Sequence, residues 1–202
     1  MNKLASLVVT SLVTLSIACN VQSGQNEPEP SGAELPKQEV VTPPGSTVPG
    51  ATGGEQLSFP IWEREDVQPK SARFGQSYGL EHFRGRTVIV VLLEGFCPYC
   101  QSNSRVAQTL QDTLAAENLD VQIVVLGDAH AEELQSRVSL PIFRDRDGQA
   151  WNAMRVGASK HDTFVFDPNG KLTYFWKGSY QGDASRWTAD VGAAARSVAR
   201  SR

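Results

Sequence analysis

The pattern of apolar and polar positions predicts alternating strands and helices over residues 80–200. Residues 87–93 are apolar almost throughout, which predicts a central strand covered on both faces. Residues 98–117 place Val106, Leu110 and Leu114 on one face, so a helix follows that strand. Similar patterns predict strands at 120–127, 141–144, 162–167 and 171–176, and helices at 128–138, 151–156 and 183–200. This order indicates an α/β fold, a mixed central sheet with helices on both faces.

The first residues have a different pattern, which is typical of an export signal. Lys3 precedes a short apolar stretch, residues 5–18, that is too short to span a bilayer as a helix. The residues Ser-Ile-Ala-Cys at 16–19 resemble a bacterial lipoprotein signal, although Ser16 stands where leucine is usual. We therefore expect a signal peptide over residues 1–18 and a lipid on Cys19. Ordinary cleavage, which would leave Cys19 as a free thiol, is the alternative.

Residues 19–55 are predicted to be a disordered tether that follows the lipidated residue. They contain six prolines, no aromatic residue and no apolar periodicity, so they cannot bury enough surface to offset the entropy of ordering. Prolines and an excess of glutamate keep such a segment extended. Residues 56–202 then form the folded domain, and the lipid would hold it at the membrane of the cell envelope, facing the periplasm or the exterior.

The charge of the predicted domain excludes one class of partner. Residues 56–202 contain 17 basic and 17 acidic residues, so the domain is formally neutral. A nucleic-acid partner would require a clustered basic excess, and we expect no such partner. Nothing in the sequence predicts a resident cofactor.

The candidate chemistry lies at Cys97-Pro98-Tyr99-Cys100, between the predicted strand 87–93 and the predicted helix that follows it. Unpaired N–H groups at a helix start stabilise a thiolate, so the pKa of Cys97 should lie below the value of about 8.5 of a free cysteine. A structural disulfide is disfavoured, because closing so short a loop adds little stability. A zinc site is also disfavoured, because no second pair of Cys or His follows at a suitable spacing. The spacing therefore favours a redox-active pair.

The order of these elements, with the cysteine pair at the end of the first core strand, resembles the thioredoxin superfamily. Within it, several stretches resemble the N-terminal domain of selenoprotein P: 87–100, 140–143, Trp151, 157–167 and 170–174. The resemblance covers roughly residues 80–180 and implies a thioredoxin-like three-layer sandwich. Cys97 stands in the place of the relative's selenocysteine, and Cys100 matches the second redox residue. The relative's selenium-rich tail has no counterpart here, so the resemblance implies thiol redox activity and not selenium transport.

One position departs from the usual thioredoxin pattern. A proline normally precedes the strand that corresponds to 162–167, and here the matching residue is His161. The fold implied by the resemblance places this loop opposite the cysteine pair, so we expect the imidazole within reach of the Cys97 sulfur. There it would favour the thiolate or accept the thiol proton. A surface histidine is the alternative, and a His161→Pro exchange is expected to restore a more usual loop.

Three functions are compatible with this sequence. The first is a membrane-anchored thiol-disulfide oxidoreductase, in which Cys97 attacks a disulfide and Cys100 resolves the mixed disulfide. The second is a thiol peroxidase that uses Cys97. The third is a non-enzymatic carrier of a soft metal ion held by Cys97, Cys100 and His161. The expected partners are accordingly protein thiols and disulfides, or small thiols and peroxides.

Overall fold

The described part of the chain consists of residues 58–155, 157–178 and 183–200 of a computed structural model. The predicted signal peptide over 1–18, the lipidation site Cys19 and the tether over 19–55 lie outside these residues.

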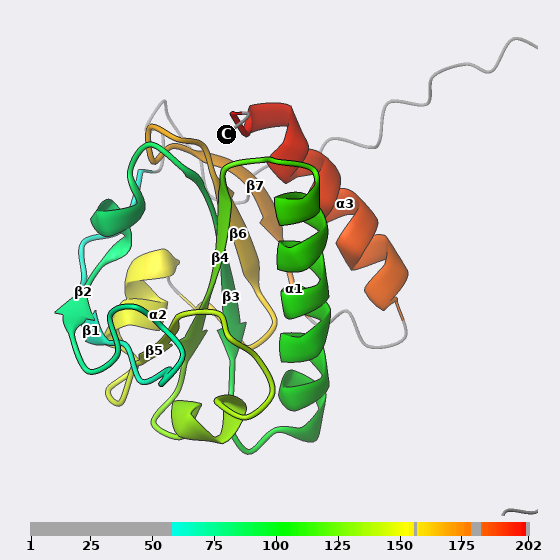
Figure 1. Cartoon of the computed structure of the whole chain (residues 1–202). Helices are drawn as coiled ribbons and strands as arrows, with labels where there is room; N and C mark the ends of the chain where they lie inside the picture. Colours follow the sequence, from blue (N-terminus) through cyan, green and yellow to red (C-terminus); the bar gives the residue numbers. More distant parts are fainter. Residues whose placement is uncertain (1–57, 156, 179–182, 201–202) are drawn as a thin grey trace, which may run out of the picture. The chain divides into compact units, whose positions relative to one another are not determined.

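A mixed five-stranded sheet with β3 at its centre organises the domain (Figure 1). Its strands, in spatial order, are β5 (Ile142–Arg144), β4 (Val121–Gly127), β3 (Thr87–Leu93), β6 (Thr163–Phe166) and β7 (Leu172–Trp176). β4 runs parallel to β3 and β5 parallel to β4, whereas β6 is antiparallel to β3 and β7 antiparallel to β6. The predicted mixed sheet is confirmed, and each predicted strand exists with its ends shifted by no more than one residue.

β3 is buried along its whole length because its side chains alternate between two apolar cores. Ile89, Val91 and Leu93 pack into the core beneath the long helices. The residues between them pack into a second core on the other face, which is rich in aromatic rings. That core includes Trp62, Tyr78, Phe83, Phe143, Phe164 and Phe175. An unbroken apolar run is therefore what this position in the sheet requires.

The helices cover both faces of the sheet, as predicted (Figure 1). α1 (Pro98–Ala116) and α3 (Ala184–Val198) lie side by side on one face, and α2 (Gln149–Met154) lies on the other. Pro98 suits the first turn of α1, because the N–H it lacks would have no partner within the helix. No helix in the described residues is long and apolar enough to cross a membrane.

The helix predicted over residues 128–138 is shorter than expected. It is a single 3₁₀ turn, η2 (Ala131–Leu134), and Asp128 does not cap it. The Asp128 carboxylate instead accepts the N–H groups of Gly95 and His130. The Asp128 side chain thus joins the turn before η2 to the segment that precedes the cysteine pair.

The sequence pattern also missed a small ribbon that precedes the 3₁₀ turn η1 (Leu80–Phe83). β1 (Arg64–Glu65) and β2 (Ser77–Tyr78) pair antiparallel on the same side of the sheet as α2 (Figure 1). These strands have two residues each, too few for an alternating pattern to appear.

A buried carboxylate fastens this ribbon to the sheet. Asp66 is fully buried. Its oxygens accept the Tyr78 hydroxyl at 2.7 Å, the Ser71 hydroxyl at 2.5 Å and the backbone N–H groups of Gln68 and Ile142 at 3.0 and 3.2 Å. One side chain therefore joins the ribbon to the start of edge strand β5.

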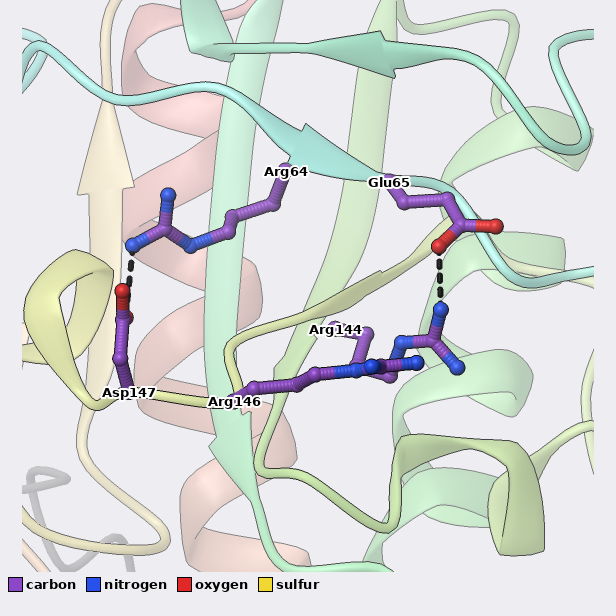
Figure 2. Close-up of a pocket in the computed structure, with 5 residues that line it drawn as sticks. All are labelled: Arg64, Glu65, Arg144, Arg146 and Asp147. Atoms are coloured by element: carbon purple, nitrogen blue, oxygen red, sulfur yellow. Dashed lines mark hydrogen bonds and ion pairs between the residues drawn. The ribbon is translucent and has the colours of Figure 1, made fainter.

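Charged side chains line a hollow of about 300 Å³ between β1 and the end of β5 (Figure 2). Arg64 pairs with Asp147 at 2.8 Å, and Arg144 pairs with Glu65. Arg64 also pairs with the buried Asp145 at 2.9 Å. These ion pairs join the ribbon to the loop after β5, so we regard the hollow as part of the scaffold.

Replacing Asp66 with Ala should lower the free energy of unfolding by about 2–4 kcal/mol, because the variant leaves buried N–H and O–H donors without an acceptor. Urea unfolding of the full chain measures the effect. Asp147→Ala is the matched control, since it removes an exposed acid from the same region and should change stability little. Equal stability of the two variants would contradict this account of Asp66.

Candidate active site

The two thiols lie where the central strand passes into α1, and they have unlike surroundings. Cys97 is the N-cap residue, and its sulfur accepts the N–H of Cys100 at 3.5 Å. Cys97 is partly exposed, whereas Cys100, one turn into the helix, is fully buried. Both are free thiols. The site therefore presents one accessible sulfur with a second behind it.

Close packing shapes the turn that carries Cys97. A Cβ atom on Gly95 would lie 1.7 Å from the carbonyl oxygen of His130, so only glycine fits there. Asp128 accepts the Gly95 N–H at 3.0 Å, and Gln101 donates its side-chain amide to the Gly95 carbonyl at 2.8 Å. None of these residues was predicted as part of the site. A glycine two residues before Cys97 was the one available signal of close backbone approach.

The surroundings shift the two thiol pKa values in opposite directions. Partial burial acts to raise the pKa of Cys97, but hydrogen bonds from Cys100 and Tyr99 and the positive charge of Lys160 outweigh it, so the pKa falls below its ordinary value. Burial raises the pKa of Cys100 to about 12, and the neighbouring Cys97 adds to the shift. Cys97 is thus the more acidic thiol by a wide margin.

Strand pairing brings His161 to the same end of the sheet. β6 is antiparallel to β3, so the loop before Thr163 returns beside the end of β3, where Cys97 follows. The His161 N–H donates to the Leu92 carbonyl at 2.6 Å, and the Leu92 N–H donates to the Asp162 carbonyl at 3.0 Å. His161 is 3% exposed, so the alternative of a surface histidine is wrong.

The imidazole contacts Cys100 directly, and a ring nitrogen also lies within 4.8 Å of the Cys97 sulfur, as the sequence led us to expect. Nε2 of His161 lies 3.7 Å from the sulfur of Cys100, and Nδ1 lies 2.7 Å from the amide nitrogen of Asn103. Cys97 precedes α1 as its N-cap, whereas Cys100 and Asn103 are three residues apart on the buried face of the helix. Asn103 was not predicted as a site residue, although its spacing from Cys100 is visible in the sequence.

Two charged residues border the site. Lys160 pairs with Glu94 at 2.8 Å, across the gap between the loop before β6 and the end of β3.

Burial is the main cause of a lowered pKa at His161, and the positive charge of Lys160 lowers it further. The imidazole is therefore neutral at neutral pH and can either accept or donate a hydrogen bond.

The donor atoms of Cys97, Cys100 and His161 all lie within 4.8 Å of one another. A tetrahedral ion with metal–ligand bonds of about 2.0–2.3 Å would need them about 3.3–3.8 Å apart. The cluster comprises three residues in the part of the chain that the structure describes, whereas a structural zinc site takes four. This geometry suits exchange between two sulfurs better than a closed metal site.

Two large apolar side chains next to Cys97 are open to solvent. Phe96 is 62% exposed and Tyr99 58% exposed. Phe96 packs on the ring of His130, with the two centroids 4.3 Å apart. The accessible thiol is therefore bordered by exposed apolar surface.

The fold and the cysteine pair together define a thioredoxin-like thiol redox protein. Residues 60–175, more than half of the chain, match the AhpC/TSA family, and the chain belongs to this family. No curated protein matches it. The predictions of a thioredoxin-like fold and of a thiol-disulfide oxidoreductase are confirmed at the level of the family.

Solved structures with the same fold are described as thiol-disulfide proteins. A putative thiol:disulfide interchange protein DsbE from Chlorobium tepidum has a TM-score of 0.57 and 17% identity, and the match covers 70% of this chain and 98% of that one. A putative protein disulfide isomerase from Bacteroides thetaiotaomicron has a TM-score of 0.54 and 12% identity, with 71% and 91% covered. At such identities the similarity shows the fold alone.

The backbone of His161 makes a proline at this position unfavourable, contrary to the expectation from the sequence. His161 has a φ of 72°, whereas proline fixes φ near −65° and lacks the N–H that bonds to Leu92. His161→Pro should lower the free energy of unfolding by about 3 kcal/mol or more in urea titrations. His161→Asn is the control, because asparagine keeps the N–H and tolerates positive φ. A proline variant as stable as the asparagine variant would contradict the backbone argument.

Proposed function

We propose that the chain catalyses thiol-disulfide exchange with Cys97 as the attacking thiol and Cys100 as the resolving thiol. The observation that carries this proposal is the contrast between the two sulfurs, one partly exposed with a lowered pKa and the other buried with a raised pKa. An attacking thiol needs access and thiolate character, and a resolving thiol needs a position directly behind it.

The proposed reaction has two displacements at sulfur. The Cys97 thiolate attacks a substrate disulfide, that bond breaks, and one substrate sulfur leaves as a thiolate. Cys100 then attacks Cys97 in the mixed disulfide, and the second substrate sulfur leaves. The substrate is reduced by two electrons, and Cys97 and Cys100 become a disulfide. The same steps in reverse oxidise a substrate dithiol.

Peroxidase activity and metal transport are the competing functions. A peroxide would oxidise Cys97 to a sulfenic acid, and Cys100 would displace water from it to form the same disulfide. A metal carrier would instead be isolated with an ion and would lose it when a chelator is added. Disulfide turnover, peroxide consumption with a dithiol donor and metal content, measured on one preparation, separate the three.

Alkylation as a function of pH tests the assigned roles. In a Cys19→Ser background, so that two thiols remain, Cys97 should reach its half-maximal rate at a lower pH than an ordinary cysteine, because its pKa is lowered. Cys100 should react much more slowly than Cys97 in the folded chain, because it is buried and its pKa is raised. Peptide mapping by mass spectrometry identifies the modified residue, and the Cys97→Ser variant is the control. Faster alkylation of Cys100 would reverse the roles.

Replacing Cys100 with Ser should trap the reaction halfway. Cys97 would still attack a substrate disulfide, but no neighbouring thiol would displace the second substrate sulfur. Covalent adducts should therefore accumulate on the Cys100→Ser variant and be absent from the Cys97→Ser variant, as measured by non-reducing electrophoresis. Persistent adducts on the Cys97 variant would contradict the proposal.

We also propose that the redox domain is held at the cell envelope by a lipid on Cys19. The support is the charged start, the short apolar stretch and the small residues before Cys19. Mass spectrometry of the mature N-terminus in the native host should find Cys19 as the first residue, carrying lipid. An unmodified N-terminus in the soluble fraction would refute this. The finer resemblance to the N-terminal domain of selenoprotein P stays a prediction from the residues.

A further inference from the structure

We infer that His161, oriented by Asn103, takes the proton from Cys100 when Cys100 attacks the mixed disulfide on Cys97. This inference rests on the proposed thiol-disulfide exchange. It assigns the histidine to the second displacement and makes Asn103 a positioning residue.

The burial of Cys100 creates the need for such a group. A thiol is a poor nucleophile until it loses its proton, and Cys100 is fully buried with a pKa raised to about 12. Bulk water does not reach this sulfur to remove the proton. Nε2 of His161, at 3.7 Å, is the nitrogen in a position to accept it.

The charges around His161 favour the neutral imidazole, which is the form that can act as a base. Lys160 on the same loop disfavours the protonated ring, while Glu94 after β3 and Asp162 favour it. On α1, the groups that face the ring are Cys97 and Cys100. Burial is the largest influence and lowers the pKa of His161. The ring is therefore ready to accept a proton at neutral pH.

The orientation of the Asn103 carboxamide determines which ring nitrogen of His161 carries the hydrogen. Nε2 can accept a proton only if Nδ1 carries the ring hydrogen. The Asn103 carboxamide lies against Nδ1, with its nitrogen at 2.7 Å. In that orientation the Asn103 amide donates a hydrogen bond to Nδ1. A half-turn of the carboxamide brings its oxygen to the same place, where it accepts the hydrogen bond from Nδ1–H. The lone pair of Nε2 then points toward Cys100 and can accept its proton.

The step balances without any further reactant. The Cys100 proton moves to Nε2 of His161 while the sulfur electron pair forms the bond to Cys97. The bond between Cys97 and the substrate breaks, and its electron pair leaves on the substrate sulfur, which takes the proton from the imidazolium. In the mixed disulfide Cys97 has no negative charge, so its repulsion of a Cys100 thiolate is gone. Deprotonation is therefore easier at this stage than in the free dithiol.

An aromatic disulfide that releases a chromophore at each displacement separates the two halves of the reaction. The full chain in a Cys19→Ser background is mixed with 4,4′-dithiodipyridine in a stopped-flow spectrometer. The first equivalent of thiopyridone reports attack by Cys97, and the second reports attack by Cys100. His161→Asn should leave the first phase within about twofold and slow the second about 100-fold, the size expected for loss of a general base.

The pH profile of the second phase distinguishes proton transfer from a merely structural role. In the unmodified site the rate should rise as His161 loses its proton, below pH 6.5, and then level off. In His161→Asn the rate should keep rising with pH above this range, because burial still raises the pKa of Cys100. Asn103→Leu should slow the second phase, because the imidazole loses the side chain that orients it. Asn103→Asp should restore the rate of the second phase, and the inflection of its pH profile should move to higher pH, because a carboxylate beside the ring favours the imidazolium. The exposed His82 provides the control variant His82→Ala, which should change neither phase.

Two results would overturn the inference. One is an unchanged second phase in His161→Asn. The other is an equal loss in both phases, which would make the imidazole a partner of Cys97 instead. If the unmodified site releases no thiopyridone at all, the proposed exchange itself fails. That result is distinguishable from failure of the inference about His161, because it is seen without any variant.

Discussion

The antiparallel pairing of β6 with β3 is the constraint on which the site depends. Two reciprocal backbone hydrogen bonds, from His161 to Leu92 and from Leu92 to Asp162, extend this pairing beyond the last paired side chains. They fix the loop before β6 at the same end of the sheet as the start of α1. The imidazole therefore reaches its place through backbone geometry, and the side-chain contacts with Cys100 and Asn103 complete the arrangement.

The same pairing explains the conformation of His161. Its positive φ is uncommon for a residue with a Cβ and disfavoured by roughly 1–2 kcal/mol. The buried N–H bond to Leu92 and the contacts of the ring offset that strain. Unusual backbone conformations in packed structures are often found at functional sites. Here the strained residue, His161, is the one that contacts the Cys100 thiol.

The sequence was enough to predict the sheet, the long helices and the position of the cysteine pair, because these depend on local patterns. An unbroken apolar run marks a strand with two covered faces, and a proline in the first turn marks a helix start. The remaining features depend on contacts between distant segments. Asp66 and Asp128 each also accept a hydrogen bond from a distant segment, and no local pattern indicates those contacts. His161 was recognised by its position before a strand. Its contact with Cys100 could not be predicted, because it depends on which face of α1 the pairing of β6 with β3 brings against the imidazole.

The burial of Cys100 also determines what kind of oxidative damage this site can suffer. An oxidant in solution meets only Cys97, since Cys100 has no exposed surface. A sulfenic acid on Cys97 would lie within 4.8 Å of a thiol that can convert it to a reversible disulfide before a second oxidant arrives. Irreversible oxidation to sulfinic acid would thus require two oxidant molecules to reach Cys97 faster than Cys100 responds. A chain with this arrangement should tolerate bursts of oxidant that would inactivate a solitary exposed cysteine.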